Sequence, residues 1–136
     1  DTTGAAHPLL VRERIGILQA TFPGAEFIAH FPDTRGNGIV NSVAALEMGR
    51  RYVDSSLGAI GGQPATKSNK YPHGITGNTC TEDLVGLLNE MGVRTGIDMD
   101  RLIALGQRAE AVIGQPLRAN IIHSGPVRHH PKAFQQ

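Results

Sequence analysis

Two short apolar stretches, each followed by a polar loop that contains glycine, constrain the possible folds of this chain most strongly. The first covers residues 25–31 and ends in Pro-Asp-Thr-Arg-Gly, and the second covers residues 50–54 and enters a loop that extends to Asn78. A helix is predicted before each stretch, over 7–22 and over 39–48, because apolar residues recur there at helical spacing. Helices that alternate with strands are typical of parallel strands joined by right-handed crossovers. The sequence therefore predicts an α/β fold.

Two more helices are predicted after the long loop. Thr79 and Glu82 are spaced as in a capping box, so one helix is expected to begin here. Asp98 is placed to cap a last helix, which ends before Pro116. Residues 1–114 are predicted to form one domain, and 115–136 a C-terminal tail, because no period is evident there. Each helix is expected to direct one row of apolar residues to the core: Val11, Ile15, Leu18 and Phe22; Ile39, Val43 and Leu46; Leu84, Leu87, Leu88 and Met91; Leu102, Leu105, Ala109 and Val112.

The loop between Asp54 and Asn78 is the first candidate for a functional site. It contains Gly58, Gly61 and Gly62, which admit backbone angles that a side chain forbids and which let a ligand approach the main chain. Long loops that follow strands in α/β enzymes are usually functional, although a plain connection is the alternative.

Composition and charge exclude several classes of protein. The net charge of the 136 residues is +1 and the basic residues are scattered, so neither nucleic acid nor a membrane surface is an expected partner. No apolar run reaches the roughly 20 residues of a membrane-spanning helix, and the first residues do not resemble a signal peptide. The single cysteine, Cys80, suits a reducing compartment, so a cytoplasmic location is expected.

Two parallel strands are too few for a stable α/β sheet, because they leave the sheet edges open and most helix faces uncovered. Residues 1–4 resemble the exit from a third strand. We therefore expect this chain to be one part of a larger fold.

Several motifs occur together in the order and spacing of one known family. They are Asp1-Thr2-Thr3-Gly4, His30 to Gly36, Asn41 to Gly49, Val53 to Gly58, Gly61-Gly62, Gly77-Asn78, Thr81 to Val85, Met91-Gly92 and Thr95-Gly96. On these motifs, residues 1–106 resemble the C-terminal part of the hydroxymethylglutaryl-CoA lyase family of metal-dependent lyases and aldolases. The resemblance implies the C-terminal portion of a (β/α)₈ TIM barrel, incomplete in this chain, from the end of strand six to the final helices.

The resemblance also implies a reaction. Members of this family cleave a carbon–carbon bond in a 3-hydroxyacyl-CoA such as 3-hydroxy-3-methylglutaryl-CoA, releasing acetyl-CoA and a keto acid. A divalent ion, Mg²⁺ or Mn²⁺, binds the substrate's hydroxyl and carboxylate and stabilises the alkoxide. The residues implied are His30 and Asn78 as metal ligands, Gln63, Asp33 and Thr2 at catalytic positions, and Asp1, Thr34, Ser55, Gly61 and Gly62 at substrate-binding positions.

Simpler interpretations of these residues remain open. A lone histidine at the end of an apolar strand is more often structural than a ligand, so only the family resemblance favours a metal at His30. Asparagine is common in turns and at helix caps, so Asn78 fits either role. Asp33 and Asp54 fit the role of residues that order their turns.

Three features depart from the family pattern. Pro32 stands where the second histidine of a His-x-His metal motif is expected, and proline offers no donor atom to a metal. Gln63 stands where a cysteine transfers protons, and glutamine does not titrate. The aspartate ligand and arginine of the family's first strand are not found before Asp1. Tyr71 and His73, in the same loop as Gln63, are weaker candidates for a proton donor.

These departures leave three hypotheses. The chain is the C-terminal segment of an acyl-CoA lyase, completed by an N-terminal barrel half in the same or another chain, and a homodimer is possible. Alternatively, it belongs to a related aldolase, acyltransferase or carboxyltransferase. The third hypothesis is a non-catalytic barrel subunit.

Overall fold

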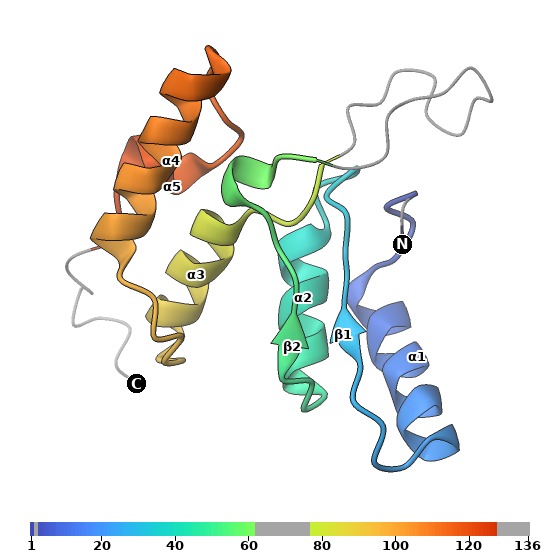
Figure 1. Ribbon diagram of the computed structural model, residues 1–136. Helices are drawn as coiled ribbons and strands as arrows, with labels where there is room; N and C mark the ends of the chain where they lie inside the picture. The colour runs from blue at the N-terminus through green and yellow to red at the C-terminus, as the bar shows by residue number, and fades with distance from the viewer. Residues whose placement is uncertain (2, 62–76, 128–136) are drawn as a thin grey trace, which may run out of the picture.

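The computed structural model describes residues 1, 3–61 and 77–127. Four longer helices, two short strands, a 3-10 turn and a terminal helix follow one another (Figure 1). In chain order they are α1 (Pro8–Thr21), β1 (Ile28–Ala29), α2 (Gly38–Glu47), β2 (Tyr52–Val53), η1 (Leu57–Ala59), α3 (Thr81–Glu90), α4 (Met99–Ile113) and α5 (Asn120–Ser124). The predicted alternation of helices and strands is confirmed. Within the described residues, no helix has both the length and the apolar character to cross a membrane.

The two strands pair in parallel, as predicted, with Ile28 opposite Tyr52 and Ala29 opposite Val53. Each strand is two residues long, shorter than the predicted 25–31 and 50–54. The physical reason is that in the described part of the chain each strand has only the other as a neighbour, so few ladder bonds define it.

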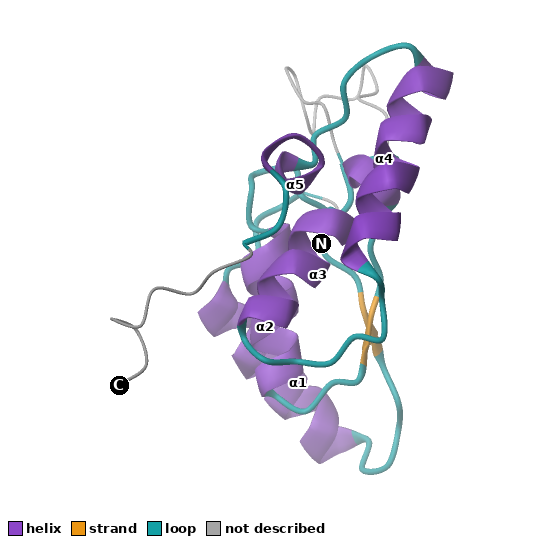
Figure 2. Ribbon diagram, turned by 90° about the vertical axis from the view of Figure 1, so that its left-hand side faces the viewer, coloured by secondary structure: helices purple, strands orange, loops and turns teal. Residues whose placement is uncertain are grey.

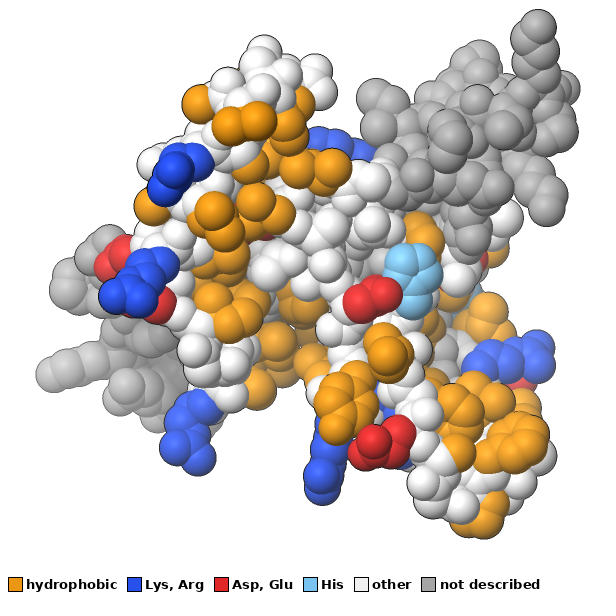
Figure 3. Space-filling model, viewed as in Figure 1, with side chains coloured by type: hydrophobic (Ala, Val, Ile, Leu, Met, Phe, Trp, Pro, Cys, Tyr) orange, Lys and Arg blue, Asp and Glu red, His pale blue; other side chains and the backbone are white. Residues whose placement is uncertain are grey.

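Helices α1 and α2 lie on one side of the strands (Figure 2). The opposite face leaves Ile28 70% and Tyr52 50% exposed, and in Figure 3 apolar side chains gather on the face turned to the viewer. Alternation along a strand sends neighbouring side chains to opposite faces, so Ala29 contacts the helices while Ile28 does not. Helices on one face and an apolar second face are what one sector of a (β/α) barrel presents.

The core between α1 and α2 consists mainly of small residues. Val11 and Ile15 of α1 pack against Ala44 and Ala45 of α2, which are almost fully buried. The prediction that Ile39, Val43 and Leu46 form the buried face of α2 is therefore wrong, since all three are only half-buried. Small side chains let the two helices approach closely, which places the bulkier ones at the side of the contact. Leu18 of α1 and Phe22, which follows its last residue, were also predicted to face the core, but they are exposed.

Glu82 does not act in the predicted capping box. The residue that precedes α3 is Cys80, whose side chain makes no capping bond, and the Thr79 hydroxyl donates instead to the carbonyl of Phe31 at 2.7 Å. Glu82 is fully buried, and its Oε2 and Oε1 accept from the backbone N–H of Gly58 at 2.8 and 3.0 Å. The carboxylate thus connects α3 to η1.

The predicted C-terminal tail contains helix α5, which packs into the fold. Ile122 is 5% exposed and Ala119 1%, in a cluster with Ala59 and Cys80. A side chain at Gly106 of α4 would overlap Ile122. The prediction of a tail from residue 115 is therefore wrong for α5, because contacts across the fold order a segment whose own sequence shows no period.

The final long helix begins as predicted and buries fewer residues than predicted. The Asp98 carboxylate accepts from the N–H of Arg101 at 3.1 Å and caps α4. Leu102 is buried, but Leu105 is 52% and Val112 87% exposed. In α3, Leu84 is buried, whereas Met91 at the C-terminus is exposed. Both helices therefore bury only part of the face that their period predicts.

Candidate active site

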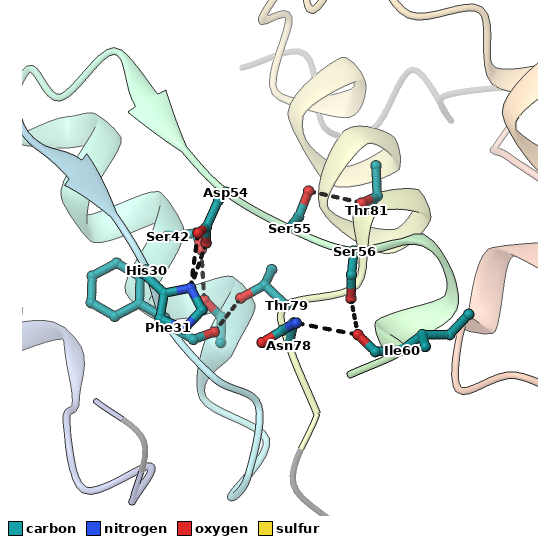
Figure 4. A network of polar contacts seen from close by, with 11 residues as sticks. His30, Phe31, Ser42, Asp54, Ser55, Ser56, Ile60, Asn78, Thr79 and Thr81 are labelled. Carbon is teal, nitrogen blue, oxygen red and sulfur yellow. Dashed lines mark hydrogen bonds and ion pairs between the residues drawn. The ribbon is translucent and has the colours of Figure 1, made fainter. Parts of the chain in front are cut away.

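A histidine and an aspartate meet at the carboxyl ends of the two strands. Because Ala29 is opposite Val53, the next residues along each strand, His30 and Asp54, lie side by side. The Asp54 N–H donates to the carbonyl of Ala29 at 3.1 Å. Nδ1 of His30 lies 2.7 Å from Oδ1 and 2.9 Å from Oδ2 of Asp54 (Figure 4). Both side chains are 50% exposed, so one face of the pair is open.

The segment 77–81 crosses the ends of both strands and is fixed to each. Toward β1, Pro32 forms an antiparallel bridge with Asn78, and the Asp33 N–H donates to the carbonyl of Gly77 at 2.7 Å. Toward β2, the Ser56 N–H donates to the carbonyl of Thr79 at 2.9 Å. Asn78 is therefore held at the same end of the sheet as His30, although 48 positions separate the two in the sequence.

The side chain of Asn78 is oriented by the loop after β2. Its Nδ2 donates to the carbonyl of Ile60 at 3.2 Å, which leaves Oδ1 as the acceptor. Gly61 has a φ of +94°, and an added Cβ there would lie 3.0 Å from Nδ2 of Asn78. Glycine at 61 thus provides both the backbone angle and the space that this orientation requires.

The donor set fits a divalent cation in part. Nδ1 of His30 is used by Asp54, so Nε2 is the nitrogen left for a metal, and Asn78 supplies an amide oxygen. Oxygen donors with an imidazole suit Mg²⁺ or Mn²⁺. In the described part of the chain no three His, Cys, Asp or Glu side chains cluster as a complete metal site. These two residues therefore offer two donor atoms, fewer than a complete coordination shell needs.

The chain matches the HMGL-like family over residues 1–108. It belongs to the HMGL-like family. Among curated relatives, the hydroxymethylglutaryl-CoA lyase YngG of Bacillus subtilis is 38% identical over 86% of this chain and 37% of its own length. The (R)-citramalyl-CoA lyase of Chloroflexus aurantiacus is 39% identical over 93% of this chain and 38% of its own. The chain thus spans less than two-fifths of these two relatives.

Solved structures of the family share this architecture. An HMG-CoA lyase from Acinetobacter baumannii, in complex with coenzyme A and 3-methylmalate, superposes with a TM-score of 0.82 at 36% identity, covering 96% of this chain and 41% of that one. The B. subtilis HMG-CoA lyase gives a TM-score of 0.78 at 34% identity, over 91% and 40%. The fold is part of a TIM barrel, as predicted, and the strand ends that carry His30 and Asp54 are where such barrels place their active sites.

Other predicted site residues of this HMGL-like chain use their side chains in hydrogen bonds within the fold. Oδ1 of Asp33 accepts from the N–H of Gly38, at the start of α2, at 2.8 Å. The Asp1 carboxylate accepts from the N–H groups of Ala5 and Ala6. Ser55 accepts from the Thr81 hydroxyl at 2.8 Å. These contacts agree with the turn-ordering alternative for Asp33, and the roles of Asp1 and Ser55 toward substrate stay predictions.

Thr34 packs against Gly4, where an added Cβ would lie 3.1 Å from Cβ of Thr34. This contact brings the first residues of the HMGL-like chain beside the turn after β1. Thr2, Gly62, Gln63, Tyr71 and His73 lie outside the residues that the structure describes, so their predicted roles stay predictions.

The contact that Asp54 makes with His30 was not predicted from the sequence. Asp54 was interpreted as a residue that orders its turn, yet its carboxylate contacts the imidazole of His30 directly. The strand register, which pairs Ala29 with Val53, sets Asp54 beside His30. This register is known only once the two strands are paired in the structure.

The family's proton-transferring cysteine has no substitute in Cys80. This thiol is 5% exposed and lies 3.2 Å from Oε2 of Glu82. Burial, together with the nearby carboxylates, raises the pKa of Cys80 from 9.0 to about 12. The thiol therefore stays protonated and its role is structural.

Cys80 is expected to resist alkylation in the folded protein. With a pKa of about 12 instead of 9.0, the reactive thiolate is scarce at pH 8, and we expect iodoacetamide to label Cys80 at least about tenfold more slowly than in urea. Mass spectrometry of the Cys80 peptide measures both rates. Since the folded pKa is raised, the associated stability is present below pH 9 and is lost as the pH rises toward 12. Equal labelling rates in the two states would contradict this environment.

Proposed function

We propose that the protein containing this barrel portion is a carbon–carbon lyase of a 3-hydroxyacyl-CoA, assisted by Mg²⁺ or Mn²⁺. The observation that carries the proposal is the His30–Asp54 pair beside Asn78 at the carboxyl ends of parallel strands, in a chain of the HMGL-like family. Relatives named for lyases of two different CoA thioesters support the class of reaction. Both thioesters are therefore candidate substrates.

In this proposal His30 and Asn78 bind the cation through Nε2 and Oδ1. A bound divalent ion supplies Lewis-acid stabilisation of the alkoxide that precedes carbon–carbon cleavage. The chain contributes rigid placement: Asp54 orients the ring of His30, and the carbonyl of Ile60 orients the amide of Asn78. Rigid ligands lower the cost of organising the site when substrate binds.

The remaining ligands are proposed to come from an N-terminal barrel half. A groove of about 240 Å³ lies beside β1, lined by apolar residues that include Leu10, Leu18, Phe27 and Ile28. A further parallel strand with its helix would cover this groove and pair the free edge of β1. The relatives, which are more than twice as long as this chain, support such a completion.

The test is cleavage of 3-hydroxy-3-methylglutaryl-CoA and of citramalyl-CoA by the assembled protein. We expect acetyl-CoA from at least one thioester, loss of the reaction after EDTA treatment, and recovery with Mn²⁺. The assay is chromatography of the CoA products. Metal binding without cleavage of either thioester would favour the related aldolase or transferase, and cleavage that persists in EDTA would contradict the metal's role.

Pro32 specifically favours the non-catalytic alternative. Its ring occupies a strand-end position from which the family pattern expects a second imidazole, and its backbone is engaged with Asn78. If neither metal binding nor turnover is detected in the folded, assembled protein, the barrel serves as a non-catalytic subunit.

A further inference from the structure

We propose that Asp54 is a positioning residue that fixes the tautomer and ring orientation of His30, so that Nε2 is presented to a divalent cation. This inference rests on the proposed metal at His30. It goes further by assigning a role to a residue that the family resemblance placed neither among the metal ligands nor among the catalytic or substrate-binding positions.

The geometry sets the direction of the hydrogen bond. Both oxygens of Asp54 lie within 2.9 Å of Nδ1 of His30. A carboxylate only accepts, so the proton between the groups belongs to Nδ1. In the neutral ring, a proton on Nδ1 leaves the lone pair on Nε2, which is the nitrogen that the contact does not use.

The backbone holds Asp54 in this position. The bond from its N–H to the carbonyl of Ala29 continues the parallel ladder by one residue beyond β1 and β2. The ion pair between Arg12 and Glu47 differs, because two long side chains reach across from separate helices. The His30–Asp54 contact therefore requires less side-chain ordering than an ordinary surface pair.

The substitution at residue 32 increases the importance of this contact. Pro32 supplies no imidazole, so His30 is the histidine ligand that remains from the motif. A carboxylate on the second ring nitrogen makes a ligating imidazole more basic and fixes its orientation. We therefore expect the metal affinity of this site to depend on Asp54.

The test combines two measurements on the assembled protein. Nitrogen-15 NMR of labelled histidine, without metal, reports which nitrogen of His30 is protonated, and calorimetric titration with Mn²⁺ alone reports affinity. We expect the Nδ1–H form in the wild type, a shift toward Nε2–H in Asp54→Ala, and about 10- to 100-fold weaker Mn²⁺ binding by the variant. Glu47→Ala removes a carboxylate of equal exposure from the Arg12 pair and is the matched control, with neither quantity changed.

Two results would overturn the inference: an Nε2–H tautomer in the wild type, or an Asp54→Ala protein whose tautomer and affinity match the wild type. If Asp54→Ala does not fold, Asp54→Asn keeps the shape and is expected to weaken Mn²⁺ binding as well, because its amide group also offers a donor to Nδ1. A wild type that binds no Mn²⁺ contradicts the proposed function, while the metal-free tautomer still decides the role of Asp54.

Discussion

Replacing His30 with alanine is expected to lower acyl-CoA cleavage about 10³-fold, since loss of a ligand forfeits about 4 kcal/mol of the charge stabilisation that a bound cation provides. The ring is 50% exposed and its Nδ1 is bound to Asp54, so alanine removes the proposed cation ligand without opening a buried cavity. Fold stability should therefore change little. The measurements are acetyl-CoA release at saturating Mn²⁺ and the melting temperature of the same preparation.

The matched control is His123→Ala in α5. His123 is another exposed histidine paired with a carboxylate, with Nε2 3.2 Å from Glu110, and it lies on α5, away from the strand ends. Its removal should leave turnover unchanged. If His30→Ala and His123→Ala were equally active, His30 would not be a ligand and the proposed site would be wrong.

Replacing Glu82 with alanine is expected to lower the free energy of unfolding by about 3 kcal/mol, because it leaves a buried donor without an acceptor and creates a cavity. The donor is the N–H of Gly58, in a turn whose φ of +57° is left-handed and against which Leu117 packs. The thiol of Cys80 loses its partner as well. Chemical denaturation of the assembled protein, followed by circular dichroism, measures the change.

Two companion variants separate this contact from general effects on α3. Glu90→Ala changes an exposed glutamate of the same helix and should alter stability by less than about 0.5 kcal/mol. Glu82→Gln keeps one oxygen that can accept from Gly58 and should lose less than alanine does. An alanine variant as stable as Glu90→Ala would show that the bond to Gly58 contributes nothing.

The local sequence predicted the order of the helices and strands from α1 to α4 and contained the family motifs. Apolar residues at helical spacing predicted α1 to α4, and Asp98 was correctly placed as the cap of α4. Parallel pairing followed from the alternation of helices and strands. The motifs around His30 and Asn78 led to the family that the comparisons confirmed. These features are encoded within short windows, where spacing and capping act through nearest neighbours.

Tertiary contacts decided two features for which the prediction was wrong, the partner of Glu82 and the ordering of α5. Glu82 has the spacing of a capping residue, yet it bonds to Gly58, 24 positions earlier, because η1 lies over the start of α3. Helix α5 shows no period of its own and is ordered by Asp83, which accepts from the N–H groups of Asn120 and Ile121.

The same division applies to the candidate active site. Sequence motifs mark His30 and Asn78 as candidate ligands. The contact between Asp54 and His30 follows only from the register of the two strands. A sequence specifies which groups are present and their local conformation, whereas partners distant in the chain are chosen when packing brings two backbones to a common register.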